Sequence, residues 1–393
     1  MNILMVHPHD IYSSIEPWTV RIVYIAKEFV KKGHNVKLVY FPLEWGQKKA
    51  AETPEGITVI PFPRMHGPHV LISNILRLCN LARWADVIHF QKCFYHAALP
   101  AVAAGIFHGK PLHYDWDDWE LKIYEVSTRP SFLRNIMWNF LSFLETTIPK
   151  IVDTVSCASK RLKVECERLG VDKDRIFDAH VGADIVRFNP DVSGEAIRDK
   201  YNITKPLILY LGQLHGGQYV EAFIETASRL INDHRKDLAF MIAGDGYQAG
   251  ELKKMSRRLN LNGKLIFTGA IPHELVPQYI AAADVCLACF EENEVTLCKS
   301  PLKVVEYLAS GRAIVASDVG EVPRMLDGAG VLTPPGDVDS LADGILKILQ
   351  NPSLKKNLER LARERAEKEY NWTVTATNLL GAYEKAVQIN SAR

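Results

Sequence analysis

The residues best suited to bind an anion fall in a predicted helix between positions 299 and 311. Pro301 suits the first turn, where its missing N–H costs nothing, and Gly311 suits the cap at the other end. The helix start at 299–302 therefore offers backbone donors and a positive dipole end to an anion such as a diphosphate. Lys303 adds a positive charge there, and Glu306 can accept two hydrogen bonds from a diol such as ribose. An ordinary surface helix would not explain why these residues fall so near one helix start.

Three carboxylates close together in the sequence form a second candidate site. Asp115, Asp117 and Asp118 follow an apolar strand predicted at 111–114, at the end where parallel sheets expose side chains to ligands. Like charges this close repel one another, which can raise the pKa of one carboxyl group. We predict that Asp117 acts at a reacting centre with Asp118 beside it, and that Asp115 faces a ligand. Two alternatives stay open, namely a metal ion site and a cap for the following helix.

Two weaker candidates follow other predicted strands. His7, His9 and Asp10 come after a strand at 3–6 and face a ligand if that strand is correct, with a plain turn as an equal alternative. Cys286 and Cys289 form a lone CxxC in an apolar segment, so we favour strand packing over a metal or redox site. The seven cysteines are odd in number and scattered, which gives a disulfide framework little support.

Composition limits the class of protein. The chain has 393 residues, which at about 150 per domain suggests two or three domains. Its 47 Lys and Arg against 46 Asp and Glu leave a net charge of +1, so we expect no nucleic-acid partner. The start lacks the features of a signal peptide, and the longest apolar run, 97–107, is shorter than the ~20 residues that span a bilayer. We therefore expect a cytoplasmic protein.

The elements that must position these residues follow a repeated pattern. Short apolar runs alternate with amphipathic helices, which predicts an α/β protein with parallel sheets and helices on both faces. The runs lie at 3–6, 35–40, 57–60, 86–90, 111–114, 154–157 and 175–179, and then at 206–211, 238–243, 265–268, 285–288, 313–317 and 330–333. A polar linker at 184–205 separates the two sets. We predict two doubly wound domains, 1–187 and 188–370, with the ligand site in a cleft between them.

One segment is more apolar than a surface helix requires. Residues 132–144 include Phe132, Ile136, Trp138, Phe140 and Phe143. We favour core packing for this segment. The alternative is a dock for a membrane surface or a lipid acceptor, which would place the protein at the inner face of a membrane.

Taken in order, these motifs resemble the GT-B fold of the "glycosyl transferases group one" superfamily. The resemblance rests on residues 299–318, with Asp284 and Val285 before them and 320–323 after them. Further matching motifs lie at 32–36, 181–184, 188–190, 243–246, 268–272, 335–337 and 370–372. Each motif is weak alone, and their order and spacing make the match specific over nearly the whole chain.

The resemblance implies an enzyme of the hexosyltransferase type that works without a metal or other cofactor. It would move a sugar from a nucleotide-diphosphate sugar to an acceptor hydroxyl, with retention of anomeric configuration, for instance in polysaccharide biosynthesis. Residues 1–187 would bind the acceptor, a glycan, a lipid-linked molecule or a small molecule. Residues 188–370 would bind the donor, and 371–393 would pack back on the first domain.

The same resemblance suggests individual roles in the second domain. The residues assigned to donor binding are Gly212, Gln213, His215, Gly244, Ile271, Lys299, Ser300, Pro301, Leu302 and Glu306. The family's Arg and Lys fall within 212–218, where His215 is the one candidate cation. Lys299, Lys303 or Arg312 must then neutralise the phosphates, and we assign the stabilisation of the leaving diphosphate to Lys303.

Two further family features are missing. The first of two glutamates spaced along the donor-binding segment falls at Cys298, and a Gly-Gly pair of the first domain falls at Glu16-Pro17. The alternative function is therefore a catalytically silent relative that binds a nucleotide sugar or a partner subunit. A dinucleotide-dependent oxidoreductase is disfavoured, because no GxGxxG motif follows the strand at 3–6.

Overall fold

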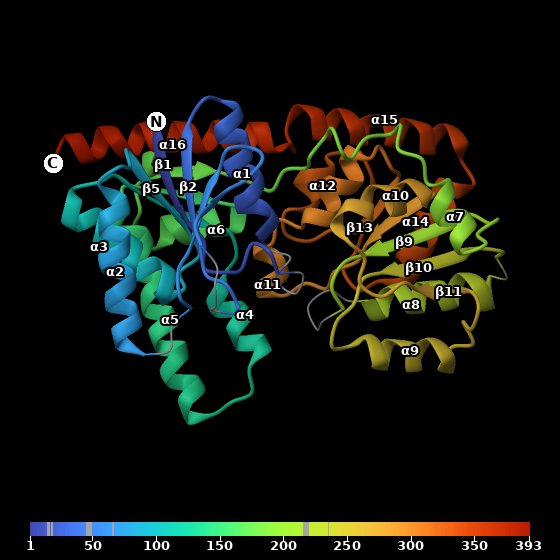
Figure 1. Ribbon diagram of the computed structural model, residues 1–393. Coiled ribbons are helices and arrows are strands. Elements are labelled where there is room, and N and C mark those ends of the chain that lie inside the picture. The colour runs from blue at the N-terminus through green and yellow to red at the C-terminus, as the bar shows by residue number, and fades with distance from the viewer. Residues whose placement is uncertain (14–15, 17–18, 45–48, 65–66, 215–219, 235) are drawn as a thin grey trace. The chain divides into compact units, whose positions relative to one another are not determined.

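The chain forms two compact units, Met1–His180 with Trp372–Arg393 and Val181–Asn371. The computed structural model describes residues 1–13, 16, 19–44, 49–64, 67–214, 220–234 and 236–393 (Figure 1). The second unit begins a few residues before the predicted boundary at 187. Its start is fixed by bonds within that unit, from Val181 N to Ser300 Oγ at 3.4 Å and from Ala183 N to the Tyr370 carbonyl at 2.9 Å.

Within the described residues, unit 1 is built on an eight-stranded sheet in the order β3-β4-β2-β1-β5-β6-β7-β8. Its strands are β1 (Asn2–Val6), β2 (Asn35–Tyr40), β3 (Ala51–Glu52), β4 (Thr58–Pro61), β5 (Val87–Gln91), β6 (Leu112–Trp116), β7 (Thr154–Cys157) and β8 (Ile176–Asp178). Its helices are α1 (Val20–Lys31), α2 (Pro68–Ala82), α3 (Tyr95–His108), α4 (Glu120–Ser127), α5 (Phe132–Ile151), α6 (Lys160–Arg168) and α16 (Trp372–Ser391). Neighbouring strands run parallel except for the edge pair β3 and β4.

Unit 2 contains, in the part of the chain described, a six-stranded parallel sheet in the order β11-β10-β9-β12-β13-β14. Its strands are β9 (Leu207–Leu211), β10 (Ala239–Ala243), β11 (Leu265–Phe267), β12 (Val285–Ala288), β13 (Ile314–Ser317) and β14 (Val331–Thr333). Its α-helices are α7 (Glu195–Lys200), α8 (Val220–Ser228), α9 (Ala249–Arg258), α10 (Val276–Ala282), α11 (Glu294–Cys298), α12 (Leu302–Ala309), α13 (Val322–Leu326), α14 (Val338–Leu349) and α15 (Pro352–Lys368).

The strand orders confirm the predicted α/β class with two doubly wound sheets. In unit 1 the strand order reverses between β1 and β5, and in unit 2 between β9 and β12. Open parallel sheets bind ligands beyond the carboxyl ends of the strands at such reversals. Apart from the antiparallel edge strand β3, the strands are largely buried, as expected when helices cover both faces of a parallel sheet.

The last helix, α16, is part of unit 1. Thr154 Oγ donates to the Ala382 carbonyl at 3.1 Å, and the Tyr383 hydroxyl lies 2.8 Å from His89 Nδ1. Thr373 Oγ donates to Glu28 on α1 at 2.7 Å. These contacts fix α16 on the sheet and on α1. Among the described residues, every helix is too short or too polar to cross a lipid bilayer.

Candidate functional site

The carboxyl ends of β9 and β10 in unit 2 present bare backbone. Gly212 and Gly244 follow these strands with φ of +142° and +152°, values that L side chains rarely adopt. A Cβ on Gly244 would lie 1.9 Å from the Gly212 carbonyl oxygen, and one on Gly246 would lie 2.2 Å from that of Leu214. The two loops therefore pack backbone against backbone, and only glycine fits. Gln213 is half-buried beside them, and His215 lies outside the described residues.

Lys303 lies directly beneath this bare backbone. Its side chain is buried, with Nζ 4.0 Å from the ring centroid of Tyr210 and 5.6 Å from that of Phe290. A Cβ on Gly212 would lie 2.8 Å from Nζ, so the amine reaches the end of β9 at the reversal point. Burial lowers the pKa of Lys303 to about 7, with a smaller contribution from Lys299. A bound anion would favour the charged form and raise that pKa.

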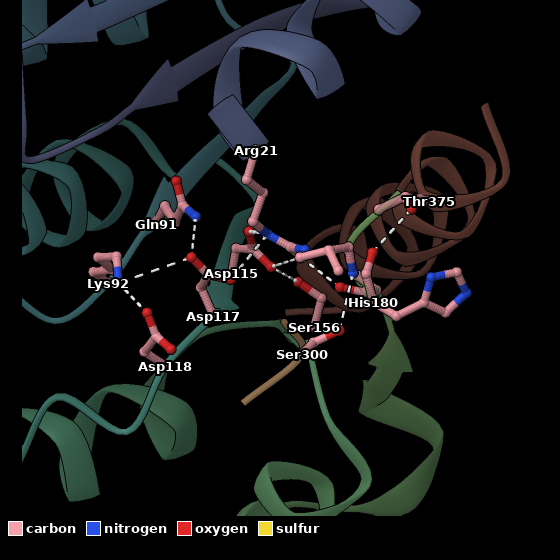
Figure 2. A network of polar contacts seen from close by, with 12 residues as sticks. Arg21, Gln91, Lys92, Asp115, Asp117, Asp118, Ser156, His180, Ser300 and Thr375 are labelled. Atoms are coloured by element: carbon pink, nitrogen blue, oxygen red, sulfur yellow. Dashed lines mark hydrogen bonds and ion pairs between the residues drawn. The ribbon is translucent and has the colours of Figure 1, made fainter. Parts of the chain in front are cut away.

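The helix predicted at 299–311 begins at Leu302 in the structure, so Pro301 precedes its first turn. Helix α11 ends at Cys298, Pro301 is the N-cap of α12 with ψ of 116°, and α12 begins at Leu302. Pro301 is therefore outside the first turn, because its extended backbone belongs to the connection between the two helices. Ser300 within this connection is bonded to Val181 (Figure 2), while Lys299 and Leu302 are half-buried.

Glu306 is a buried carboxylate with a partner that the sequence did not indicate. His273 Nε2 lies 3.0 Å from Glu306 Oε1. The His273 ring packs 5.8 Å from that of Phe188, and its carbonyl accepts from Arg187 at 2.7 Å. Ile271, two residues earlier, is half-buried. The contact places the 271–273 loop beside Glu306, and the only signal for it was the position of His273 just after a predicted ligand-contacting turn.

In unit 1, Asp115 is wholly buried and is not open to a ligand, which corrects the prediction. Arg21 donates to it from Nε at 2.9 Å and from a terminal nitrogen at 2.8 Å, and Ser156 Oγ donates at 2.6 Å (Figure 2). The physical reason is that β6 continues to Trp116, two residues beyond the predicted strand end. The nearby guanidinium holds the pKa of the Asp115 carboxyl below its usual range.

Asp117 lies just beyond the end of β6, in contact with three other polar side chains. Gln91 Nε2 donates to its Oδ2 at 2.9 Å, Lys92 Nζ lies 3.8 Å away, and Arg21 Nε lies 3.5 Å from Oδ1 (Figure 2). Burial raises the pKa of Asp117 to about 6, aided by the charges of Asp118 and Asp115 and opposed by Arg21 and Lys92. The carboxyl group therefore changes charge near neutral pH, a property of acid–base groups at functional sites.

Lys92 is a central residue that sequence reasoning missed. It is buried, adopts a positive φ of 64°, and its Nζ contacts the carboxylates of Asp118 at 2.9 Å and Glu120 at 2.5 Å. A non-glycine residue in this conformation is uncommon and often marks a functional site. The signal that could have found it is its position two residues after the strand predicted at 86–90. Because Lys92 and Arg21 pair with these carboxylates, the cluster does not form an open cation site.

His7 fixes the orientation of the Gln91 amide. Its Nδ1 lies 2.8 Å from Gln91 Oε1. Since Gln91 donates to Asp117 through Nε2, its oxygen must accept from His7, which assigns the His7 proton to Nδ1. Burial holds the pKa of His7 well below its ordinary value, so the ring is neutral. The neutral side chains of His7 and Gln91 thus position the Asp117 carboxyl group.

Asp10 and His9, in the loop after β1, contact other protein groups nearby. Asp10 accepts from the amides of Tyr12 and Leu43, both at 3.1 Å, which supports the turn interpretation over a ligand contact. His9 Nδ1 lies 3.1 Å from Glu16 Oε1, and Arg64 also bonds that carboxylate.

The CxxC pair supports the packing interpretation. Cys286 and Cys289 are buried, and burial raises the pKa of each thiol to about 12. Within the described residues, no three His, Cys, Asp or Glu side chains converge as they would around a metal ion.

Family models match both units of the chain. Residues 19–187 match the model described as Glycosyltransferase Family 4, and residues 205–351 match the model described as Glycosyl transferases group 1. Among curated proteins, the chain is 27% identical to an alpha-D-kanosaminyltransferase from Streptomyces kanamyceticus over 48% of each chain. It is 26% identical to a phosphatidyl-myo-inositol mannosyltransferase from Mycolicibacterium smegmatis over 66% of this chain and 64% of that one. The chain thus spans about half to two thirds of the length of these relatives.

Solved structures share the whole fold. A sucrose-phosphate synthase from Thermosynechococcus elongatus superposes with a TM-score of 0.75 at 18% identity, covering 100% of both chains. The Anabaena protein HepE, solved in complex with UDP and glucose, gives a TM-score of 0.73 at 15% identity over 97% of this chain and 98% of that one. At this level of identity the likeness shows the fold, which is the GT-B class.

Proposed function

Because this chain belongs to the group 1 glycosyltransferases, we propose that it transfers a hexose from a nucleotide-diphosphate sugar to an acceptor hydroxyl. The observation that supports this most is the position of Lys303 beneath the bare backbone of Gly212, with Glu306 three residues further along α12. A buried amine and a glycine backbone suit a diphosphate, and a buried carboxylate suits a ribose diol.

In unit 2, each group has a separate task toward the donor. The charged form of Lys303 would offset the charge of the leaving diphosphate. Glu306 would accept hydrogen bonds from the ribose hydroxyls, and His273 holds one of its oxygens in place. The backbone near Ile271, in the same loop as His273, would contact the base. These roles need no divalent cation, so we propose a metal-independent reaction.

In unit 1, Asp117 would act on the chemical step. We propose that the acceptor oxygen bonds to the anomeric carbon on the face from which the diphosphate leaves, so that the configuration is retained. The bond from that carbon to the diphosphate oxygen breaks with its electron pair, and a diphosphate oxygen takes the acceptor proton. Asp117 as a carboxylate would orient the acceptor hydroxyl or offset positive charge on the sugar ring. Lys92, Gln91 and His7 position it, and Asp118 holds Lys92.

The acceptor is proposed to be a hydroxyl of a glycan, a lipid-linked molecule or a small molecule, as in polysaccharide biosynthesis. We propose a cytoplasmic protein that makes peripheral contact with a membrane, supported by apolar side chains exposed on α5.

A thermal-shift screen of nucleoside diphosphates and their sugars tests the proposal. A ligand at a hundred times its dissociation constant stabilises a protein by ~2.7 kcal/mol, and we expect at least one base to do so. Donor hydrolysis then separates an active enzyme from a silent relative, because an intact site releases nucleoside diphosphate slowly even without an acceptor. Absence of both binding and hydrolysis would refute the proposal.

A further inference from the structure

The first half of helix α5 exposes a continuous apolar face. Phe132, Leu133 and Phe143 are 78%, 75% and 61% exposed. Plotted at 100° per residue, the exposed apolar residues fall on one arc and extend over roughly 16 Å of helix. They are Phe132, Leu133, Ile136, Met137, Phe140 and Phe143. The favoured prediction that 132–144 packs in the core is therefore wrong for this face.

The side chains of α5 that pack on unit 1 lie from Leu141 onward. Leu141, Leu144, Glu145 and Ile148 are buried there. Within the described residues, packing thus accounts for the later part of the helix and leaves the apolar arc largely exposed, with Phe140 contacting the Tyr95 ring at 5.8 Å between centroids. Large exposed apolar patches in soluble proteins mark sites of interaction with another molecule. The hairpin of α4 and α5 extends away from the sheet of unit 1 (Figure 1), which leaves this face accessible.

Positive charges prevail around the apolar face of α5. The only carboxylate of α5, Glu145, is buried on the packed side. Near the hairpin connection, Arg129 is exposed, and Arg134 is held by Thr128 Oγ at 3.0 Å and by the Glu125 carbonyl at 3.1 Å. The Glu125 carboxylate is paired with Lys122 at 3.1 Å. An apolar arc that carries no carboxylate, with the exposed Arg129 near its end, complements a surface that is apolar beneath and anionic above.

We propose that this face of α5 docks on the surface of an anionic lipid bilayer. Apolar side chains would enter the boundary between headgroups and acyl chains, and Arg129 and Arg134 would meet lipid phosphates. A second copy of the chain covering this face is an outcome that the test below distinguishes.

The docking face is linked to the Asp117 loop. Glu145 Oε1 accepts from the amide of Glu120 at 2.8 Å and from Trp116 Nε1 at 3.1 Å, and its Oε2 accepts from Leu121 N at 2.8 Å. These bonds tie α5 to both ends of the short segment that carries Asp117 and Asp118. Resting on the proposed function, the inference assigns the acceptor to the class of hydroxyl compounds carried on a lipid in the bilayer.

Vesicle co-sedimentation of the full-length chain tests the docking directly. We expect binding to vesicles of equal parts phosphatidylcholine and phosphatidylglycerol, and at least tenfold weaker binding to phosphatidylcholine alone. The double variant Phe132→Ser/Phe143→Ser should lose at least tenfold on the anionic vesicles. Arg129→Gln should weaken binding to the anionic vesicles only. The control Val186→Ser, which changes an exposed apolar residue of unit 2, should bind as the wild type does.

Equal binding of wild type and double variant, or no binding to either vesicle, would overturn the proposal. A wild-type dimer that the double variant converts to monomer would also overturn it, by showing that the face binds a second copy. Donor hydrolysis without vesicles keeps this result separate from the proposed function. Hydrolysis that persists while vesicle binding fails refutes the docking alone, and vesicle binding without hydrolysis of any donor refutes the proposed function and the acceptor assignment.

Discussion

Replacing Asp117 with asparagine is expected to make the folded protein more stable while it removes most of the turnover. Burial and the neighbouring carboxylates raise the pKa of Asp117 from its ordinary 3.8 to about 6. One pKa unit corresponds to ~1.4 kcal/mol, so near pH 7 the ionised group costs the fold on the order of 3 kcal/mol relative to the unfolded chain. Asparagine removes that cost and keeps an oxygen that can accept from Gln91.

The raised pKa of Asp117 determines how the stability of the wild-type fold changes with pH. Because the folded-state pKa lies above the unfolded value, the wild-type fold gains stability as pH falls through about 6, and holds all of that gain below about 3.8. The stability difference between Asp117→Asn and wild type should therefore be largest near neutral pH and small near pH ~4. With roughly 2–4 °C for each kcal/mol, the variant should melt several degrees higher at neutral pH.

The same substitution, Asp117→Asn, should lower catalytic activity while it raises stability. Loss of the carboxylate should lower kcat by ~100-fold with little change in donor affinity, because the group acts on the chemical step. The wild-type rate should fall below pH of about 6, where Asp117 takes up its proton. That acid limb should be absent from the residual rate of the variant. Thermal melts across pH, kcat profiles and calorimetry of donor binding supply the three measurements.

The exposed Asp172 gives a matched control, since Asp172→Asn should change neither the melting temperature nor kcat. Near-normal turnover in Asp117→Asn together with loss of turnover in Asp118→Asn would move the catalytic role to the next residue. Tolerance of asparagine at both positions in a folded protein would refute the reasoning and leave the cluster with a structural role only.

Other predictions concern the donor, the metal and the core. Lys303→Met should weaken nucleoside diphosphate binding by about tenfold or more. In the wild type, calorimetry should show affinity falling as pH rises through about 7, where the amine loses its charge, and Lys303→Met should remove that fall. Glu306→Ala should weaken the same binding by about tenfold, because a charged hydrogen bond contributes ~1.5–3 kcal/mol; unchanged affinity would argue against the ribose role. Excess chelator should leave the rate unchanged, and a metal-reversible loss would contradict the proposed mechanism. Arg21→Met should lower the free energy of unfolding by ~3–5 kcal/mol, since it leaves Asp115 buried without its partner, and a denaturant titration measures it.

Most of the fold could be predicted because buried parallel strands are continuous apolar runs. The runs at 154–157 and 285–288 have the same first and last residues as β7 and β12. Strand β3 has two exposed residues and no apolar run, so it gave no signal. For 132–144 the sequence indicated an apolar helix, but it does not record which part of that helix meets the core.

Site residues were predictable where their position in the fold was local. The position of Asp117 beyond the end of a parallel strand was predictable because the apolar run before it marks that strand. The partners of these groups were not predictable, because they come from distant parts of the chain. Arg21 contacts Asp115 from α1, and His273 contacts Glu306 from another loop. Nothing in the residues around Asp115 distinguished a carboxylate that faces a ligand from one that faces a buried guanidinium.

The central claim is that this chain breaks the bond between a sugar and a nucleoside diphosphate with the groups described here. The most direct measurement is the release of nucleoside diphosphate from a panel of nucleotide-diphosphate sugars, for the wild type, Glu306→Ala and Asp117→Asn side by side. The account predicts release from at least one donor by the wild type, with weaker donor binding in Glu306→Ala and a lower rate at unchanged affinity in Asp117→Asn. No release from any donor, or equal release by all three proteins, would contradict it.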